Sequence, residues 1–463
     1  MQGSAPDGDA SGNIFVVPVS GGQPRRLGPN LPPAGDPVWS PDSTQLLVCG
    51  NPPGISAAAA DWWIVPIDGA AARKTGAFDA LRLQGFFLPY GFGLPHAAAW
   101  VNGAVTFSAQ KGDSKNIWRV PFHAGALSGT ARRLTEGTTL EVFPSIAADG
   151  SLIFASLNRN AAIWALPLTS TATEAAREPQ RLTDGSTSEA TPSISADGEM
   201  LVYGATIPNH EDIWLKDLRT ERETAIAASS AAEWHPAISR DGSMIAYTVA
   251  DARQRGMLVI STTGGKPKWV SNISGWIFDW TPDKQYLLFH PKASPDPVLR
   301  RLDVRSGVVS AYLSKPGVSL FQAKFSPDAN WLAFEGVFQM PLALAGDSQL
   351  FIVRVVNGVP VAGGEWIRVG DENGWSDKPR WSPDGNALIF LSDRDGFRCI
   401  WRQRLDPASK YPIGVPEPFH HFHESRLSPR NVGLGFLEMD VAQDKIVINL
   451  GELTGNIWSL RGR

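Results

Sequence analysis

The sequence predicts an all-β fold built from one repeated unit. The unit reads Pro-x-x-Ser, Asp-Gly and an alternating Leu-x-Phe, and its turn recurs about every 40 to 60 residues along the chain. Between the turns, apolar and polar residues alternate as they do in strands, and no amphipathic helical period is present. Short strands at this spacing are typical of β-propellers, so we predict about eight four-stranded antiparallel blades.

Each unit accounts for four strands in order. The first strand runs into the Asp-Gly turn, where Asp accepts backbone N–H bonds and Gly takes a positive φ, and the second strand follows it. A third strand ends in Ile-Trp, as in residues 163–164, 213–214 and 400–401. A fourth follows another turn, as in residues 132–135 and 181–183. The caps and heptads that a helix-rich alternative would need are not found in the sequence.

The unit can be placed nine times along the chain. Eight copies are expected near residues 36–80, 94–137, 143–186, 191–230, 235–272, 278–315, 321–370 and 378–425. The ninth is a composite of two half-blades, 432–460 and 12–28, whose pairing would close the ring and leave no open sheet edge. Residues 1–11 are expected to form a disordered tail.

Nine units exceed the usual four to eight blades of a propeller. Either one unit is not a regular blade, or the chain holds one closed ring plus blades left over from a truncated neighbour. We expect a single ring of about eight blades over residues 12–463.

Composition excludes several classes of protein. The 463 residues carry a net charge of -4, so there is no basic excess to favour a nucleic-acid partner. Cys49 and Cys399 each lie in a predicted strand, which argues against a disulfide framework and against a thiolate zinc site. The longest nearly uncharged stretch, residues 86–112, is interrupted by proline and glycine, so we predict no transmembrane segment. Residues 1–13 show no signal-peptide pattern.

The repeated Ser-Pro-Asp-Gly-x-x-Leu-x-Phe with a downstream Ile-Trp, as in residues 377–401, resembles the WD40-like repeats of TolB-type propellers over nearly the whole chain. Residues 61–66 and 450–458 are similar to the propellers that form the C-terminal half of bacterial membrane-bound Ser/Thr kinases and winged-helix transmembrane regulators. The resemblance implies a periplasmic or extracytoplasmic location and a signalling role. It also implies fusion to a kinase or winged-helix module in a longer protein, although neither module is in this sequence.

Known catalytic motifs are not found in the sequence. It has no Gly-x-Ser-x-Gly elbow, Walker loop, Gly-x-Gly-x-x-Gly or kinase motif. Only residues 461–463 follow the last predicted strand, which leaves no room for the hydrolase domain of propeller peptidases. We therefore expect a non-catalytic interaction or sensor module that has no cofactor and binds a protein segment or small ligand. Two alternatives are a hydrolase or lyase with its site in the central channel, and a purely structural domain.

Two segments carry residues that can bind metals. Three of the eight histidines lie at His420, His421 and His423, and such a tract can bind Zn²⁺ or Ni²⁺. A solvated loop is favoured there, because a strand would send His420 to the face opposite the other two. The second segment is the acidic loop of Asp371, Glu372 and Asp377. It lacks the spacing of a calcium loop, so we predict no metal site.

The candidate binding residues share a position at the start of each unit. Three glutamates lie three residues before the proline of the first strand: Glu141, Glu189 and Glu233. Neighbouring positions hold Trp234, His235, Phe278, Phe321, Gln322 and Lys378. Inner strands of a propeller begin at one mouth of its channel, so these residues would form an aromatic and acidic rim that holds a ligand. Alternatively, the glutamates accept N–H bonds from adjacent loops and hold blade to blade.

Overall fold

Antiparallel strands make up most of the chain. A computed structural model describes residues 13–28, 30–31, 33–50, 60–86, 88, 94–112, 114–147, 149–168, 178–207, 210–229, 231–250, 255–292, 298–338, 348–361, 365–370, 375–423 and 426–461. Its contacts divide the chain into two compact units. Unit 1 comprises Met1–Arg159 and Leu453–Arg463, and unit 2 comprises Asn160–Glu452. The all-β prediction is confirmed for the described residues, and the predicted tail 1–11 lies outside them.

The described strands of unit 1 pair antiparallel except at Leu140 and Lys115, which pair in parallel. One sheet has the order β3 (Ala34–Trp39), β4 (Gln45–Gly50), β5 (Asp61–Pro66) and β6 (Arg73–Lys74). A second contains β7 (His96–Val101), β8 (Ala104–Lys111), β9 (Ser114–His123), β10 (Ala126–Leu127), β11 (Arg132–Arg133) and β12 (Leu140–Ile146). The strands β1 (Phe15–Val16) and β2 (Arg25–Arg26) pair with each other.

One short helix, α1 (Ala77–Leu83), was not predicted from the sequence. Its start is fixed by Asp61, whose carboxylate accepts N–H bonds from Gly76 and Phe78 at 2.7 and 3.0 Å. Phe78 then packs edge-on against the fully buried Trp62, with ring centroids 6.0 Å apart. The helix therefore exists because a buried carboxylate caps it and the unit 1 core takes up its apolar face.

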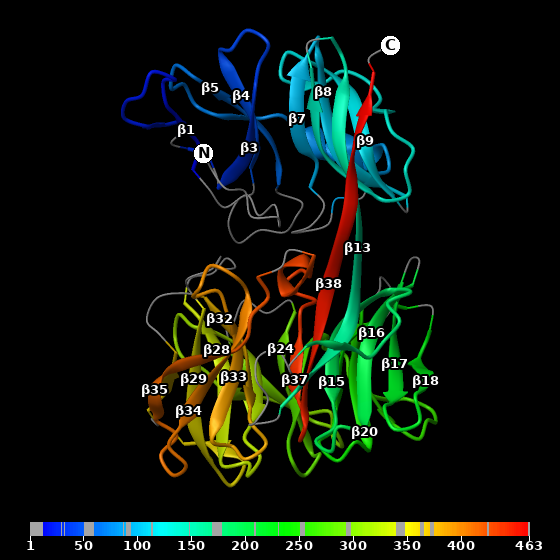
Figure 1. The fold of residues 1–463 in the computed structure, drawn as a ribbon, viewed down its shortest axis with the longest axis vertical. Helices are drawn as coiled ribbons and strands as arrows, with labels where there is room; N and C mark the ends of the chain where they lie inside the picture. The colour runs from blue at the N-terminus through cyan, green and yellow to red at the C-terminus, as the bar shows by residue number, and fades with distance from the viewer. Residues whose placement is uncertain are drawn as a thin grey trace. The chain divides into compact units, whose positions relative to one another are not determined.

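Unit 2 contains four-stranded antiparallel sheets that resemble propeller blades (Figure 1). The first is β15 (Ser188–Ile194), β16 (Met200–Ile207), β17 (His210–Asp217) and β18 (Arg222–Ala227). The second is β19 (Glu233–Ile238), β20 (Met244–Ala250), β21 (Arg255–Ser261) and β22 (Lys268–Ser271). The third is β23 (Gly275–Trp280), β24 (Tyr286–Pro291), β25 (Leu299–Asp303) and β26 (Val309–Leu313).

The remaining sheets of unit 2 follow the same pattern. One is β27 (Ser319–Phe325), β28 (Trp331–Val337), β29 (Ser348–Val356) and β31 (Ile367–Val369), with β30 (Val359–Pro360) also on β29. The next is β32 (Ser376–Trp381), β33 (Ala387–Ser392), β34 (Cys399–Leu405) and β35 (Pro412–His420). Near the C-terminus, β38 (Lys445–Leu460) pairs with β36 (Leu427–Ser428), β37 (Met439–Val441) and β13 (Leu152–Pro167), and β13 pairs with β14 (Gln180–Arg181).

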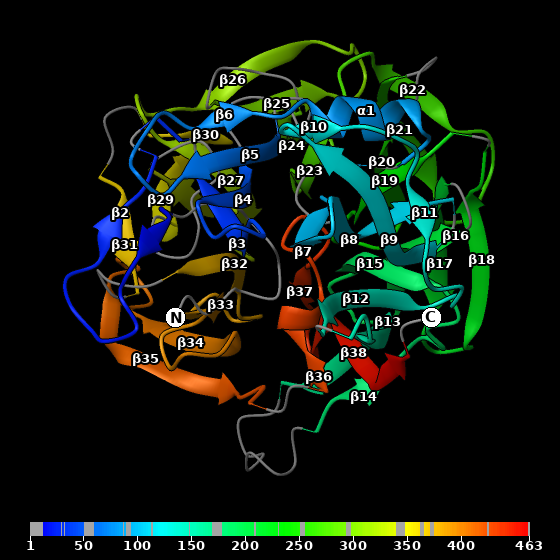
Figure 2. The same cartoon turned by 90° about the horizontal axis from the view of Figure 1, so that it is seen from above.

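The first strands of these sheets lie nearest the middle of unit 2, and outer strands such as β18, β22, β26 and β35 lie at its edge (Figure 2). The first strands contact one another in the order β15, β19, β23, β27, β32 and β37, and β37 contacts β15. We call these six strands the inner strands.

The turn that defines the repeat is confirmed. In unit 2 the Oδ1 of the turn aspartate accepts the hydroxyl two residues before it and the N–H two residues after it, as at Asp241 with Ser239 (2.7 Å) and Ser243 (3.1 Å). The same pair of bonds forms at Asp197, Asp283, Asp328 and Asp384. The hairpin is therefore specified by local side-chain chemistry.

A β-bulge interrupts most of the inner strands. The pairing register shifts between Ala190 and Ser193, and again at the matching place in the next sheets. The residue at the bulge takes a positive φ in four of them: Thr191, His235, Gln322 and Lys378. In three cases proline follows it and cannot donate to the ladder, which favours a bulge there.

The predicted closure by half-blades 432–460 and 12–28 is not confirmed among the described strands. Strands β1 and β2 pair with each other, and β38 pairs with β13. The sheet edge that residues 12–28 were expected to cover therefore pairs with β13, which belongs to the predicted 143–186 unit. A single ring of about eight blades over 12–463 is not confirmed, and neither is the alternative of one closed ring plus leftover blades.

The predicted 143–186 unit is also not a regular blade. Its second and third strands form one continuous strand, β13, of 16 residues. Residues 155–162 contain no glycine or proline, so the sequence offers no tight turn at which β13 would fold back.

Among the described residues, no helix has the length and apolar character that a membrane-spanning helix needs.

Candidate functional site

Unit 2 holds a cavity of about 380 Å³ at the C-terminal ends of its inner strands. All six inner strands contribute to it, together with the turns that follow β15, β19, β23, β27 and β32. Its volume lies in the range of small-molecule and side-chain pockets.

Two tryptophans form fixed parts of the cavity wall. Trp280 on β23 donates its indole N–H to the carbonyl of Ala237 on β19 at 2.9 Å. Trp381 on β32 donates to the carbonyl of Lys324 on β27 at 3.0 Å. Each indole bonds to the inner strand of the preceding sheet, so both rings are held in place before a ligand arrives.

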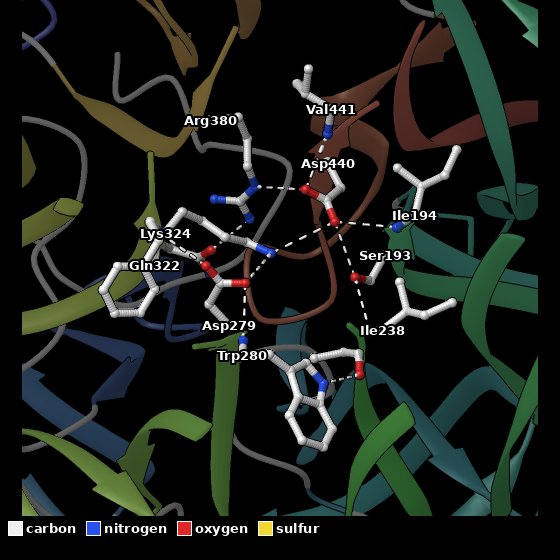
Figure 3. Close-up of polar contacts among 12 residues, drawn as sticks. Ser193, Ile194, Ile238, Asp279, Trp280, Gln322, Lys324, Arg380, Asp440 and Val441 are labelled. Carbon is white, nitrogen blue, oxygen red and sulfur yellow. Dashed lines mark hydrogen bonds and ion pairs between the residues drawn. The ribbon is translucent and has the colours of Figure 1, made fainter. Parts of the chain in front are cut away.

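Two carboxylates that line the cavity already accept hydrogen bonds from other residues of the protein (Figure 3). Asp440 accepts N–H bonds from Ile194 at 3.2 Å and from Val441 at 3.0 Å, and the hydroxyl of Ser193 at 3.0 Å. Asp279 accepts the N–H of Phe325 at 2.9 Å and that of Trp280 at 3.0 Å. Burial raises the pKa of Asp279, and the charge of Lys324 and these N–H bonds act against that rise. Both side chains therefore join neighbouring sheets.

Arg380 is a buried cation whose donors are used within the protein. It donates to the carbonyl of Pro379 at 2.8 Å, to Oε1 of Gln322 at 2.9 Å and to the carboxylate of Glu438. Its Nε donates to the carbonyl of Met439 and lies 3.7 Å from Oδ1 of Asp440. Because all of these bonds come from one planar guanidinium group, Arg380 holds β32, β27 and β37 together.

Lys324 differs from Arg380 because its ammonium has no hydrogen bond to any described residue. Its Nζ lies 3.6 Å from Oδ2 of Asp440 and 3.9 Å from Oδ1 of Asp279, beyond hydrogen-bond length. The side chain is 14% exposed and lines the cavity. An ammonium carries three donors, so Lys324 can donate to an acceptor that enters the cavity.

Four of the nine predicted binding residues meet in one aromatic cluster, which contains Trp234, His235, Phe278 and Phe321. Trp276 joins them, with its ring centroid 6.3 Å from His235 and 6.2 Å from Phe321. Burial lowers the pKa of His235 to about 3, and the positive charges of Lys292 and Lys378 add to this, so the imidazole is neutral at pH 7. None of these residues lines the cavity.

Gln322 and Lys378 belong to the buried polar network beside the cavity. Gln322 accepts from Arg380, and the Nζ of Lys378 lies 3.0 Å from Oδ2 of Asp377. Burial acts against the charge of Lys378, but the carboxylates of Asp377, Glu438 and Glu335 raise its pKa overall. Burial and the charge of Asp377 raise the pKa of Glu335, against the opposing charge of Lys378.

The three glutamates serve the loops, as in the alternative interpretation. Glu141 accepts the N–H of Gly137, Glu189 that of Gly185 and Glu233 that of Ser229, each at 3.2 Å. Their exposed fractions are 4%, 3% and 2%, and Glu141 belongs to unit 1 while the other two belong to unit 2. Buried carboxylates that accept backbone N–H groups are not open to a ligand, so these bonds favour the loop-binding interpretation over the acidic rim.

Lys324, Arg380 and Asp440 were not predicted from the sequence. For two of them the bulge hid the signal, because residues two apart on a strand share a face only where the pairing is regular. Lys324 follows Gln322 by two positions, and Arg380 follows Lys378 by two. Asp371 and Glu372 of the predicted acidic loop lie outside the described residues, and Asp377 pairs with Lys378.

No protein-family model matches the chain, and no curated protein matches it. Among solved structures, the chain is similar to a putative TolB from Agrobacterium tumefaciens, with a TM-score of 0.45 and 15% identity over 65% of this chain and 99% of that one. TolB from Acinetobacter baumannii gives 0.41 and 14% over 68% and 79%. An oligogalacturonate lyase from Vibrio parahaemolyticus gives 0.38 and 15% over 66% and 88%.

The class defined so far is an all-β protein with four-stranded sheets that resemble propeller blades. Its likeness to TolB propellers is a distant one of fold. Function must therefore be argued from the site.

Proposed function

We propose that unit 2 is a non-catalytic binding module whose cavity takes a protein segment. The observation that carries this proposal is the ammonium of Lys324, which lines the cavity and has no hydrogen bond to a described residue. A backbone carbonyl of the bound segment would accept from it. An apolar side chain of the segment would pack between the fixed indoles of Trp280 and Trp381.

The net charge of the residues that line the cavity favours a partner group without charge. Its lining holds three cations, Arg240, Lys324 and Arg380, and three carboxylates, Asp197, Asp279 and Asp440, so the formal sum is zero. The two carboxylates nearest Lys324 would repel a third one brought by a ligand. A peptide carbonyl or a hydroxyl meets Lys324 without that repulsion.

We also propose that unit 2 is a ring of its own and that the module serves in a bacterial envelope or signalling protein outside the cytoplasm. The cyclic order of contacts among the inner strands supports the ring. The repeat pattern of residues 377–401, with its resemblance to TolB-type propellers, supports the role.

Replacing Lys324 with methionine is expected to weaken peptide binding at least about tenfold, because the carbonyl acceptor loses its donor while the shape of the cavity stays similar. A random peptide library would be selected on the untagged whole chain, and the dissociation constant of the best peptide would then be measured by fluorescence anisotropy. Lys284→Met is the matched control, since the Nζ of Lys284 pairs with Asp241 at the surface at 2.6 Å.

Two results would contradict this proposal. One is that no peptide binds the unsubstituted chain more tightly than a dissociation constant of about 100 µM, a free energy near 5 to 6 kcal/mol. The other is that Lys324→Met and Trp280→Ala both bind the selected peptide as the unsubstituted chain does. Mass spectrometry of the incubated peptide tests the enzyme alternative, because cleavage would show a catalytic site.

A further inference from the structure

A second cluster of polar side chains lies at one end of the β32–β35 sheet. It consists of Asp395, Cys399, His421 and His423, and one atom from each lies within 4.8 Å of those of the others. Oδ2 of Asp395 is 2.9 Å from Nδ1 of His421 and 3.0 Å from Nε2 of His423. None of these four residues lines the cavity described above.

Strand pairing brings these residues together. Ile400 on β34 pairs with His420 on β35, so Cys399 and the residues after His420 are neighbours. Phe422 is buried in the core of unit 2, and its N–H donates to Sγ of Cys399 at 3.3 Å. Because Phe422 points inward, the alternation of the chain turns His421 and His423 together toward Asp395.

The geometry at His421 is not that of a hydrogen bond. Its Nδ1 is buried and has no hydrogen-bond partner among the described residues, although Oδ2 of Asp395 lies only 2.9 Å away. A ring nitrogen that does not donate an N–H to the nearest acceptor can carry a lone pair instead, and that lone pair can bind a cation.

We propose that Asp395, Cys399, His421 and His423 bind a zinc ion. They offer one oxygen, one sulfur and two nitrogens, which is the donor mixture and number that tetrahedral Zn²⁺ takes. Bonds of about 2.1 Å at tetrahedral angles place ligand atoms about 3.4 Å apart, so the 2.9 and 3.0 Å separations need to widen by about half an ångström. Thiolate and imidazole donors favour Zn²⁺ over Mg²⁺ or Ca²⁺.

All four positions of such an ion are filled by the protein, which defines a structural site with no open position for a substrate. The ion would join the turn that carries Asp395 to the segment that follows β35. A thiolate zinc site was not predicted from the sequence, because the two cysteines lie in strands and cannot form a cluster of thiolates. One thiolate with two imidazoles and a carboxylate needs only Cys399.

The test uses the untagged whole chain, stripped of metal with a chelator and dialysed. Added zinc is expected to remain bound at one equivalent per chain, measured by elemental analysis, and to raise the thermal midpoint of unfolding. Cobalt(II) in place of zinc is expected to give the charge-transfer absorption of a cobalt–thiolate bond. That band should be lost in Cys399→Ser and kept in Cys49→Ser, since Cys49 is the other buried free thiol and lies in unit 1.

His423→Ala is expected to weaken zinc binding at least about tenfold in competition with a chromogenic chelator. His423 is exposed, so this variant should fold, and circular dichroism without metal checks it. His123→Ala, another exposed histidine, is the control. The proposal is overturned if the stripped chain keeps no zinc at micromolar concentration. It is equally overturned if Cys399→Ser and His423→Ala bind zinc like the unsubstituted chain, or if bound cobalt shows no thiolate band.

Discussion

Arg380→Ala is expected to destabilise the protein by about 3 to 5 kcal/mol, because it removes one partner of a buried ion network. Arg380 is 2% exposed, and its guanidinium bonds to Glu438, Gln322 and two backbone carbonyls. Alanine would leave the carboxylate of Glu438 and the amide of Gln322 without this partner in the interior. Equilibrium denaturation in urea measures the loss, and hydrogen exchange in β27, β32 and β37 locates it in unit 2.

Arg402→Ala supplies the matched control for Arg380→Ala. Arg402 pairs with Glu417 at 3.0 Å, but their side chains are 36% and 48% exposed, so the loss should stay below about 1 kcal/mol. Arg380→Lys should fall between the two, because an ammonium keeps the charge but cannot fill the planar fork. If Arg380→Ala costs no more than Arg402→Ala, the network does not hold the inner strands.

Arg380 and Lys324 illustrate two uses of a buried cation in one cavity. The guanidinium is saturated by the inner strands around it, so it fixes geometry. The ammonium is held 3.6 and 3.9 Å from two carboxylates that already accept backbone N–H groups. Charge balance keeps Lys324 in place, while its donors stay available. A pre-positioned donor of this kind lowers the entropy lost on binding.

The hairpins of the repeat were predictable because their causes are local. Asp241 and its equivalents hold each turn with bonds that span two residues, and residues next to one another in sequence encode them. The helix α1 was not predictable in this way. It depends on Asp61 of β5, which lies 15 residues before Gly76 at the start of the helix.

The assembly of the sheets was harder to predict because it depends on pairing between distant residues. Sequence spacing places a blade at 143–186, but β13 continues through the expected turn and pairs with β38, almost 300 residues later. Whether two half-blades meet is decided by which edges remain open, and a repeat pattern carries no information on this.

The candidate site likewise has one part that could be predicted from the sequence and one part that could not. Aligned repeats place Trp234, His235, Phe278 and Phe321 at neighbouring positions, and their rings do lie in one cluster, while a binding role for them stays a prediction. The cavity residues could not be predicted in this way, because a β-bulge changes which side chains of a strand face inward. Lys324 and Arg380 lie just past the bulges, where simple alternation from the strand start points to the wrong face.

Glu211→Gln is expected to remove a fall in stability that the unsubstituted protein shows between pH 4.5 and about 7. Glu211 on β17 is 7% exposed, and it lies so close to Gly204 that a Cβ there would be 2.5 Å from its Oε1. Burial raises the pKa of this carboxyl from 4.5 to about 7, against the opposing charge of Lys292. Folding therefore takes up a proton in this range, and stability falls as the pH rises through it.

The size of the effect follows from the shift in pKa. A rise from 4.5 to about 7 corresponds to roughly 3 kcal/mol between the low and high ends of the range. Glutamine has no proton to lose, so Glu211→Gln should match the unsubstituted protein near pH 4 and exceed its stability above pH 8. Urea denaturation across this range measures the difference, with Glu199→Gln as an exposed control. Lys292→Met should move the fall to higher pH, because the charge that lowers the pKa of Glu211 is gone. Superimposable pH profiles for Glu211→Gln and the unsubstituted chain would show that Glu211 does not titrate in this range.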